Sequence, residues 1–137
     1  MSRALGKLAI AAGAVVGAWL ILRRPELKPP TGKLDRAELV RVISHGERVT
    51  LDDQVARDGW TIVEFSAEWC PACKQIGPIV QARVDELQSV RLRIVDIGTW
   101  ESAAARDHEI SSLPQLWLYI DGKLVTKDGQ RVLQLLE

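Results

Sequence analysis

Hydrophobic positions along residues 34–137 follow two different periods in turn. Runs rich in β-branched and aromatic residues predict strands, and runs with apolar residues three or four positions apart predict helices. In order, the pattern predicts a strand at 38–44, a short helix at 50–59, a strand at 60–67, a long helix at 70–89, a strand at 90–97, a helix at 101–110, strands at 115–121 and 123–128, and a helix at 130–137. Helices that alternate with strands before a closing strand pair predict an α/β fold, with a mixed central sheet and helices on both faces.

Two of these elements have the clearest patterns. The strand at 60–67 is apolar at most positions, which is typical of a central strand covered on both faces. The helix at 70–89 is amphipathic, with Pro78 inside it, so we expect a kink there. Its apolar residues at helical spacing are Ile76, Ile79, Val80, Val84 and Leu87.

An apolar segment stands at the amino terminus. Residues 8–22 carry no charge, and Arg3 and Lys7 precede them. With residues 4–6 included, the segment makes a helix of about 28 Å, close to the ~30 Å hydrocarbon core of a bilayer. We therefore expect residues 1–24 to form an uncleaved, single-pass membrane anchor. A cleaved signal peptide and a buried helix are the alternatives.

The location of the remaining chain is predicted from the same segment. Positive charges flank it on both sides, so the positive-inside rule gives little preference. A short basic leader ahead of an apolar run is how export segments begin, and we expect a periplasmic domain tethered to a bacterial inner membrane. Residues 25–33 hold three prolines and are expected to form an extended linker. Residues 34–137 then make one domain.

Composition narrows the class of partner. The chain has 137 residues, of which 47% are hydrophobic and 26% charged, and its 18 basic residues balance 18 acidic ones. This is an ordinary globular composition without the excess positive charge that nucleic acids attract. We expect no nucleic-acid partner, so other partners must be recognised through local features.

The chain has two cysteines, Cys70 and Cys73, at the start of the long helix. A structural zinc site needs four ligands, and only the distant His45 and His108 could add to the two thiols. The start of a helix stabilises an anion, so the thiolate of Cys70 should form readily and act as the attacking sulfur. Cys73, one turn later, is close enough to close a small disulfide ring. A redox pair is favoured, with a metal site or two inert thiols as alternatives.

Two motifs resemble the thioredoxin family. The first, VEFSAEWCPACKQIGP at 63–78, has an apolar strand, a tryptophan before the CxxC pair and a proline five residues after it. The second, ISSLPQLWLYIDGKLV at 110–125, is similar to the family's later segment, in which a cis-proline faces the disulfide. The motifs stand in the family's order and at its separation. The resemblance implies a thioredoxin fold from about Leu39 to the carboxyl terminus.

The resemblance also implies roles for individual residues. Cys70 would be the nucleophile, Cys73 the resolving thiol of a Cys70–Cys73 disulfide, and Pro114 the cis-proline of the catalytic site. Trp69 would shield the disulfide. The backbone of Leu113 would pair with an extended substrate segment as an added strand.

Glu64 and Gly129 complete the implied site. Glu64 falls where the family usually has a buried aspartate that relays a proton to the second thiol, and burial should raise its pKa. A solvated charge at the edge of the sheet is the alternative for Glu64. Gly129 would border the substrate groove. The chain departs from the family pattern at Ser66, where many members have tryptophan, and in lacking a lysine at 90–100 to pair with the buried acid.

Together these features predict a thiol–disulfide oxidoreductase that reduces or exchanges disulfides in other proteins, without a cofactor or metal. Its electrons would come from a membrane or soluble thiol donor. One alternative is a dithiol oxidase that introduces disulfides. Another is a tethered binding module that presents the groove at Pro114 and makes little use of the cysteines. Trp100 is predicted to be either a loop anchor or an interface residue.

Overall fold

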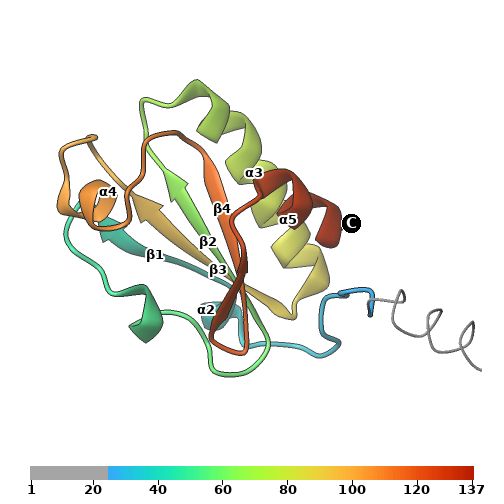
Figure 1. The fold of residues 1–137 in the computed structure, drawn as a ribbon. Helices are drawn as coiled ribbons and strands as arrows, with labels where there is room; N and C mark the ends of the chain where they lie inside the picture. Colours follow the sequence, from blue (N-terminus) through green and yellow to red (C-terminus); the bar gives the residue numbers. More distant parts are fainter. Residues whose placement is uncertain (1–24) are drawn as a thin grey trace, which may run out of the picture.

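The computed structural model describes residues 25–137, so the predicted membrane anchor at 1–24 lies outside the described residues. No helix within 25–137 has the length and apolarity needed to cross a membrane. The predicted linker, residues 25–33, contains neither helix nor strand. In Figure 1 the described chain runs in colour from the blue linker to the red carboxyl-terminal helix.

Five strands, four α-helices and one 3-10 turn make up the described chain. They are α2 (Arg36–Leu39), β1 (Val40–His45), η1 (Leu51–Asp53), β2 (Trp60–Ser66), α3 (Pro71–Leu87), β3 (Val90–Asp96), α4 (Ala103–Asp107), β4 (Gln115–Ile120), β5 (Lys123–Thr126) and α5 (Gly129–Leu135). The helix predicted at 70–89 therefore continues through Pro78 as the single element α3. The kink at Pro78 stays a prediction.

One mixed sheet runs through the molecule in the order β1-β3-β2-β4-β5. β1 and β2 both run parallel to β3, whereas β4 pairs antiparallel with β2, and β5 antiparallel with β4. Helices α3 and α5 cover one face, and α4 lies on the other (Figure 1). The predicted mixed sheet with helices on both faces is confirmed.

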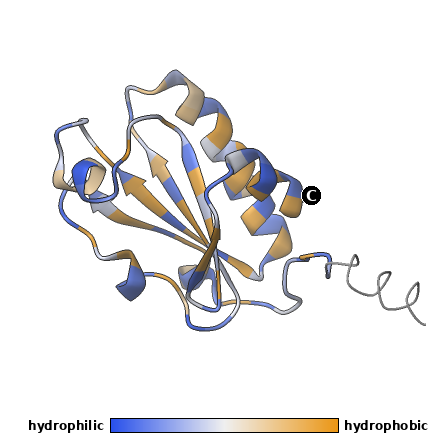
Figure 2. Ribbon diagram, viewed as in Figure 1, coloured by the Kyte–Doolittle hydropathy of each residue, from blue (hydrophilic) through white to orange (hydrophobic). Residues whose placement is uncertain are grey.

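The central strand β2 sends alternate side chains into two separate cores. On one face, Ile62 packs in the same cluster as Val80 and Val84 of α3. On the other face, Val63 and Phe65 belong to the cluster that includes α4. None of these five side chains is exposed. Figure 2 shows apolar residues both in the strands and along the helices that cover them. Burial on both faces fixes the position of β2, and with it the point where the chain leaves the sheet for α3.

The first strand begins later than predicted, because residues 36–39 form the short helix α2. A contact from a distant strand holds this helix. The guanidinium of Arg93 in β3 donates to the Glu38 carbonyl at 2.9 Å, and its other terminal nitrogen lies 3.4 Å from the Glu38 carboxylate. This contact joins residues 55 positions apart, so the local pattern at 38–44 does not reveal it.

The helix predicted at 50–59 is also wrong, because only the 3-10 turn η1 forms there. The side chain of Thr50 makes no capping hydrogen bond. The N–H of Ala56 donates to the Thr61 hydroxyl of β2 at 3.1 Å and is therefore not available to extend a helix. The segment crosses to β2 after a single turn.

Replacing Arg93 with alanine should lower the free energy of unfolding by about 2 kcal/mol. The Arg93 side chain is only 3% exposed, so its loss empties a buried position and frees α2 from β3. Urea unfolding of the full chain measures the change. The matched control is Arg83→Ala, which removes the surface pair with Glu86 and an exposed hydrogen bond to the Glu137 carbonyl, and should cost less than about 1 kcal/mol. An Arg93→Ala loss no larger than the control's would contradict the anchoring role.

Candidate active site

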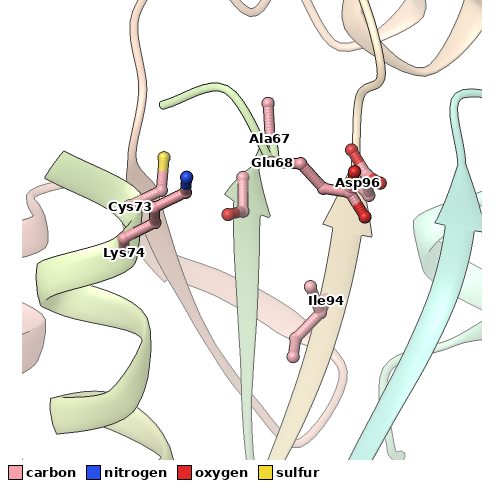
Figure 3. Close-up of a pocket in the computed structure, with 7 residues that line it drawn as sticks. Ala67, Glu68, Cys73, Lys74, Ile94 and Asp96 are labelled. Atoms are coloured by element: carbon pink, nitrogen blue, oxygen red, sulfur yellow. The ribbon is translucent and has the colours of Figure 1, made fainter. Parts of the chain in front are cut away.

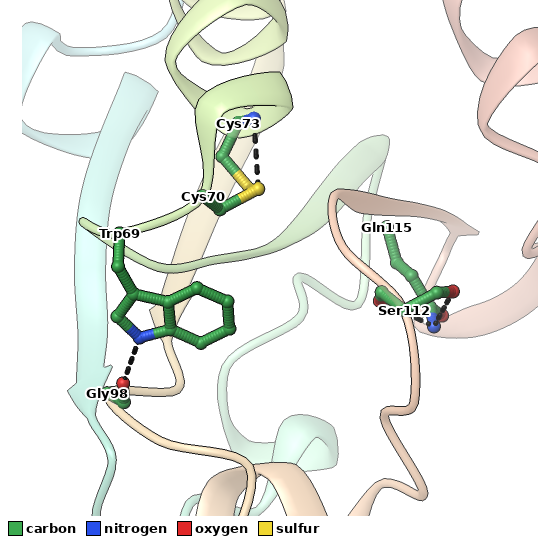
Figure 4. The surroundings of a disulfide bond; sticks show 6 residues. All are labelled: Trp69, Cys70, Cys73, Gly98, Ser112 and Gln115. Carbon is green, nitrogen blue, oxygen red and sulfur yellow. Dashed lines mark hydrogen bonds between the residues drawn. A yellow bond between two sulfur atoms is a disulfide. The ribbon is translucent and has the colours of Figure 1, made fainter.

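The two cysteines lie where the central strand passes into the long helix. β2 ends at Ser66, a short loop follows, and Cys70 is the N-cap of α3. The Cys70 N–H donates to the Ala67 carbonyl at 3.1 Å, which closes this loop. A disulfide joins Cys70 to Cys73 with 5.3 Å between their α-carbons, and both residues are buried. Figure 4 shows the disulfide at the amino-terminal end of α3.

The start of α3 supplies polar groups to the sulfur of Cys70. The backbone N–H of Cys73 points at this sulfur, with 3.1 Å between nitrogen and sulfur. Pro71 is the first residue of the helix, a position at which the missing N–H costs nothing. In the reduced protein, the same N–H and the positive end of the helix dipole stabilise a thiolate at Cys70. The geometry therefore favours a thiolate at Cys70, and the role of Cys70 as the nucleophile stays a prediction.

Trp69 lies beside the disulfide and is half exposed (Figure 4). Its indole N–H donates to the carbonyl of Gly98, in the loop after β3. Gly98 has φ +67°, a left-handed conformation that glycine adopts without steric cost. Trp100 packs against Trp69 with 5.3 Å between ring centroids and is 40% exposed. The two rings thus form an exposed aromatic pair next to the cysteines.

A cis peptide bond joins Leu113 to Pro114, directly before β4. Leu113 packs against the core cluster that contains both cysteines. Figure 4 shows Ser112 and Gln115, which flank this bond, to the right of the disulfide, whereas Trp69 lies below it. The Gln115 amide donates to the Ser112 carbonyl at 3.1 Å. Within residues 25–137, Leu113 takes part in no backbone hydrogen bond of a turn or loop. The pairing of its backbone with a substrate strand stays a prediction.

Gly129, the remaining predicted groove residue, is the first residue of α5. A side chain built there would meet only Leu116 of β4 within 4 Å. The structure therefore places Gly129 against Leu116, which follows Pro114 by two residues, and does not place it against either cysteine. Its role at the groove stays a prediction.

Glu64 lies on β2, two residues before the end of the strand, and is 2% exposed. Its sheet neighbours are Ile94 in β3 and Leu116 in β4. Burial raises the pKa of Glu64 to about 7, and within the described part of the chain no salt bridge offsets this effect. The predicted burial and raised pKa are confirmed, and the alternative of a solvated edge charge is wrong.

A cavity of about 540 Å³ opens between the start of α3 and the ends of β2 and β3. Its lining residues are Ser66, Ala67, Glu68, Cys73, Lys74, Ile94 and Asp96. In Figure 3, Cys73 and Lys74 come from α3, and Asp96 stands across from them at the end of β3. Ser66 follows Glu64 by two residues and so lies on the same face of β2. The cavity thus places the side chains of Lys74 and Asp96 near Cys73, beside the face of β2 that carries Glu64.

Comparison with known proteins identifies the family. The thioredoxin family model matches residues 42–136. This chain belongs to the thioredoxin family. It is 35% identical to a thioredoxin of Chlamydia trachomatis over 89 residues, which cover 65% of this chain and 82% of that protein. It is also 32% identical to protein disulfide isomerase-like 1-3 of Arabidopsis thaliana over 78 residues, 56% of this chain and 14% of that one.

Solved structures show the same fold. The thioredoxin of Trypanosoma brucei brucei matches with a TM-score of 0.56 and 20% identity, over 75% of this chain and 94% of that one. The oxidised thioredoxin of Plasmodium falciparum matches with a TM-score of 0.53 and 24% identity, over 70% of this chain and 95% of that one. Family membership and the Cys70–Cys73 pair together make this protein a thiol–disulfide oxidoreductase.

The sequence did not reveal two parts of this thioredoxin-family site. One is the cavity lined by Lys74 and Asp96. Its signal in the sequence was Ser66, a small residue at a position where many family members have tryptophan. The other is the pairing of Trp100 with Trp69, which depends on the loop conformation at Gly98.

Replacing Glu64 with glutamine should stabilise the folded protein at and above neutral pH. Because the folded pKa is about 7 and the unfolded value about 4.3, the native state holds a proton that the unfolded chain releases. Wild-type stability therefore falls as pH rises from about 4.3 to about 7, whereas glutamine stays neutral. The variant should be about 3 kcal/mol more stable at about pH 8 and nearly equal at about pH 4. Urea unfolding of the oxidised chain measures both values, and a pH-independent difference would contradict the assignment.

Proposed function

We propose that this protein reduces disulfide bonds in other proteins, with Cys70 as the nucleophile and Cys73 as the resolving thiol. The observation that carries the proposal is the Cys70 sulfur at the start of α3, with the Cys73 N–H 3.1 Å away and Leu113 packed beside the pair. This arrangement stabilises the thiolate and leaves a free backbone segment next to it for a client.

The first step forms a mixed disulfide. The Cys70 thiolate attacks one sulfur of a client disulfide, so that a bond forms between Cys70 and that sulfur while the client's own S–S bond breaks. The second client sulfur leaves as a thiolate and takes up a proton from water. The client is then held to the enzyme by one covalent bond.

The second step releases the client. Cys73 loses its proton and attacks the Cys70 sulfur, which re-forms the Cys70–Cys73 disulfide and expels the remaining client thiolate. Glu64 is the proposed acceptor of the Cys73 proton, because burial holds its pKa at about 7, where it can take up and release a proton near neutral pH. The proton passes through water in the cavity that Cys73 and Ser66 line. Two electrons have then moved from the enzyme to the client.

The client binds across the disulfide in this proposal. The backbone of Leu113, before Pro114, pairs with an extended client segment as an added strand. On the other side, the exposed rings of Trp69 and Trp100 cover the client's apolar side chains. Gly129 borders the far end of the same groove. A thiol donor, either a membrane protein or a soluble one, returns the pair to the dithiol state.

Cysteine substitutions test the mechanism. Cys73→Ser should accumulate a covalent complex with a disulfide-bonded client such as insulin, because Cys70 attacks the client and no second thiol resolves the mixed disulfide. Dithiothreitol should reduce this complex and release the client. Cys70→Ser should accumulate none, and both variants should lose turnover. Electrophoresis without reductant measures the complex in the full chain. A complex that forms through Cys73 in the Cys70→Ser variant would reverse the two roles.

The reduction potential tests the direction of electron flow. Equilibration of the full chain with glutathione or dithiothreitol buffers, followed by trapping of free thiols, measures it. A value near about −270 mV places the protein with reductases, and one near about −120 mV would make it a dithiol oxidase. If the cysteines form no disulfide at any potential, and the Cys70→Ser variant still binds the client, the protein would be a tethered binding module.

We further propose that residues 1–24 tether the domain to a bacterial inner membrane, with the domain in the periplasm. The Leu34 N–H donates to the Gln88 carbonyl at 2.8 Å, so the linker joins the domain just past the carboxyl end of α3. The disulfide lies at the other end of this 17-residue helix, about 25 Å away. This geometry supports a tether that leaves the cysteines facing away from the bilayer.

Cell fractionation tests the tether. The full chain should stay in the membrane pellet after alkaline extraction, and deletion of residues 2–24 should release it. Protease added to spheroplasts should digest the domain if it is periplasmic. Protection from protease until the membrane is dissolved would place the domain in the cytoplasm, and extraction by alkali would refute the anchor.

A further inference from the structure

Gly77 stands in the middle of α3, where glycine is unfavourable. Glycine in a helix interior loses more conformational freedom on folding than alanine does. A β-carbon built on Gly77 would lie 3.2 Å from Oε1 of Glu64, tighter than an ordinary contact of about 3.5 to 4 Å. Any side chain at position 77 would therefore press on the buried carboxyl.

Gly77 also relates the carboxyl to the resolving cysteine. It follows Cys73 by four residues in α3, so the two lie on the same face of the helix, about 6 Å apart along its axis. Glu64 reaches this face from β2. Its carboxyl thus lies about one helical turn from Cys73, against the bare backbone of Gly77.

Steric contact is the main constraint on the Glu64 carboxyl. Its sheet neighbours, Ile94 and Leu116, are apolar. Within residues 25–137, no hydrogen bond or charge contributes to its titration, which depends on burial alone. The packing of the carboxyl against α3 therefore decides how far its oxygens stand from Cys73.

We propose that Gly77 is a positioning residue for Glu64, because its missing side chain leaves the space that the long glutamate side chain occupies beside Cys73. The inference rests on the proton relay proposed above. An alanine at position 77 would push the carboxyl off the helix face and lengthen the path of the proton. A shorter aspartate at position 64 would leave room for that methyl group.

Titratable groups line the neighbouring cavity from α3, from β3 and from the loop after β2. They are Cys73 and Lys74, Asp96, and Glu68, respectively. β4 and α5 present the apolar Leu116 and Val132 on the face that α3 covers. None of them changes in Gly77→Ala. An altered pH profile in that variant therefore reports on Glu64.

The test compares Gly77→Ala, Glu64→Asp and the double variant in the full chain. The measured quantity is the rate at which Cys73 resolves the mixed disulfide between Cys70 and a client, between about pH 5 and about pH 9. Gly77→Ala should slow this step about tenfold at neutral pH and shift its pH profile. Adding Glu64→Asp should restore the rate to within about threefold of wild type, because the shorter side chain relieves the contact.

Ala82→Gly is the matched control, since Ala82 is exposed on the same helix. It should lower the urea midpoint through helix propensity and leave the resolution rate unchanged. A Gly77→Ala variant with wild-type rate and pH profile, and only a higher urea midpoint, would overturn the proposal. A double variant slowed by the product of the two single effects would overturn it as well.

Glu64→Gln separates this inference from the proposed relay. If Glu64→Gln resolves the mixed disulfide at the wild-type rate, the relay fails, and the role of Gly77 fails with it. If Glu64→Gln is slow and Gly77→Ala is not, only the role of Gly77 fails. Should Gly77→Ala not fold, folding of the double variant supports the steric contact, and its failure to fold overturns the proposal.

Discussion

A carboxyl group is buried one helical turn from the disulfide, and no cation among residues 25–137 acts on its titration. Position 64 is buried because β2 sends alternate side chains into two closed cores, and this position faces α3. Burial without a partner favours the protonated form and costs stability whenever the group is ionised. An apolar residue would pack at this position without that cost. A carboxyl whose pKa is near 7 beside a thiol is instead typical of a group that exchanges protons.

The same strand and helix also position the sulfur chemistry. β2 is the central strand, so its carboxyl end opens where α3 begins, and parallel sheets commonly bind their ligands at this edge. The helix start stabilises an anion at Cys70, while one turn further along, the helix packs on Glu64. One strand-helix unit thus provides a polar environment for the sulfur of Cys70, the proposed nucleophile, and an apolar one for the carboxyl of Glu64, the proposed proton acceptor.

The sequence predicted those parts of the fold that depend on local pattern. The strands around 60–66, 90–96 and 115–120 were placed within one residue, because each is a short run of β-branched or aromatic residues. Burial of Glu64 followed from its place inside such a run. By contrast, α2 depends on Arg93, and the early end of η1 depends on Thr61. Both are contacts between separate elements, which no local window contains.

The active site shows the same limit for a different reason. Cysteine, tryptophan and proline have distinctive chemistry and stand in a recognisable motif, so the sequence alone identified Cys70 and Trp69 as candidate site residues. Two glycines act through the backbone alone: Gly98 turns its carbonyl toward the indole N–H of Trp69, and Gly77 leaves space for a carboxylate. A search for reactive side chains passes over both residues. The residues that orient the reactive groups are therefore found only when the neighbours of each group are known in space.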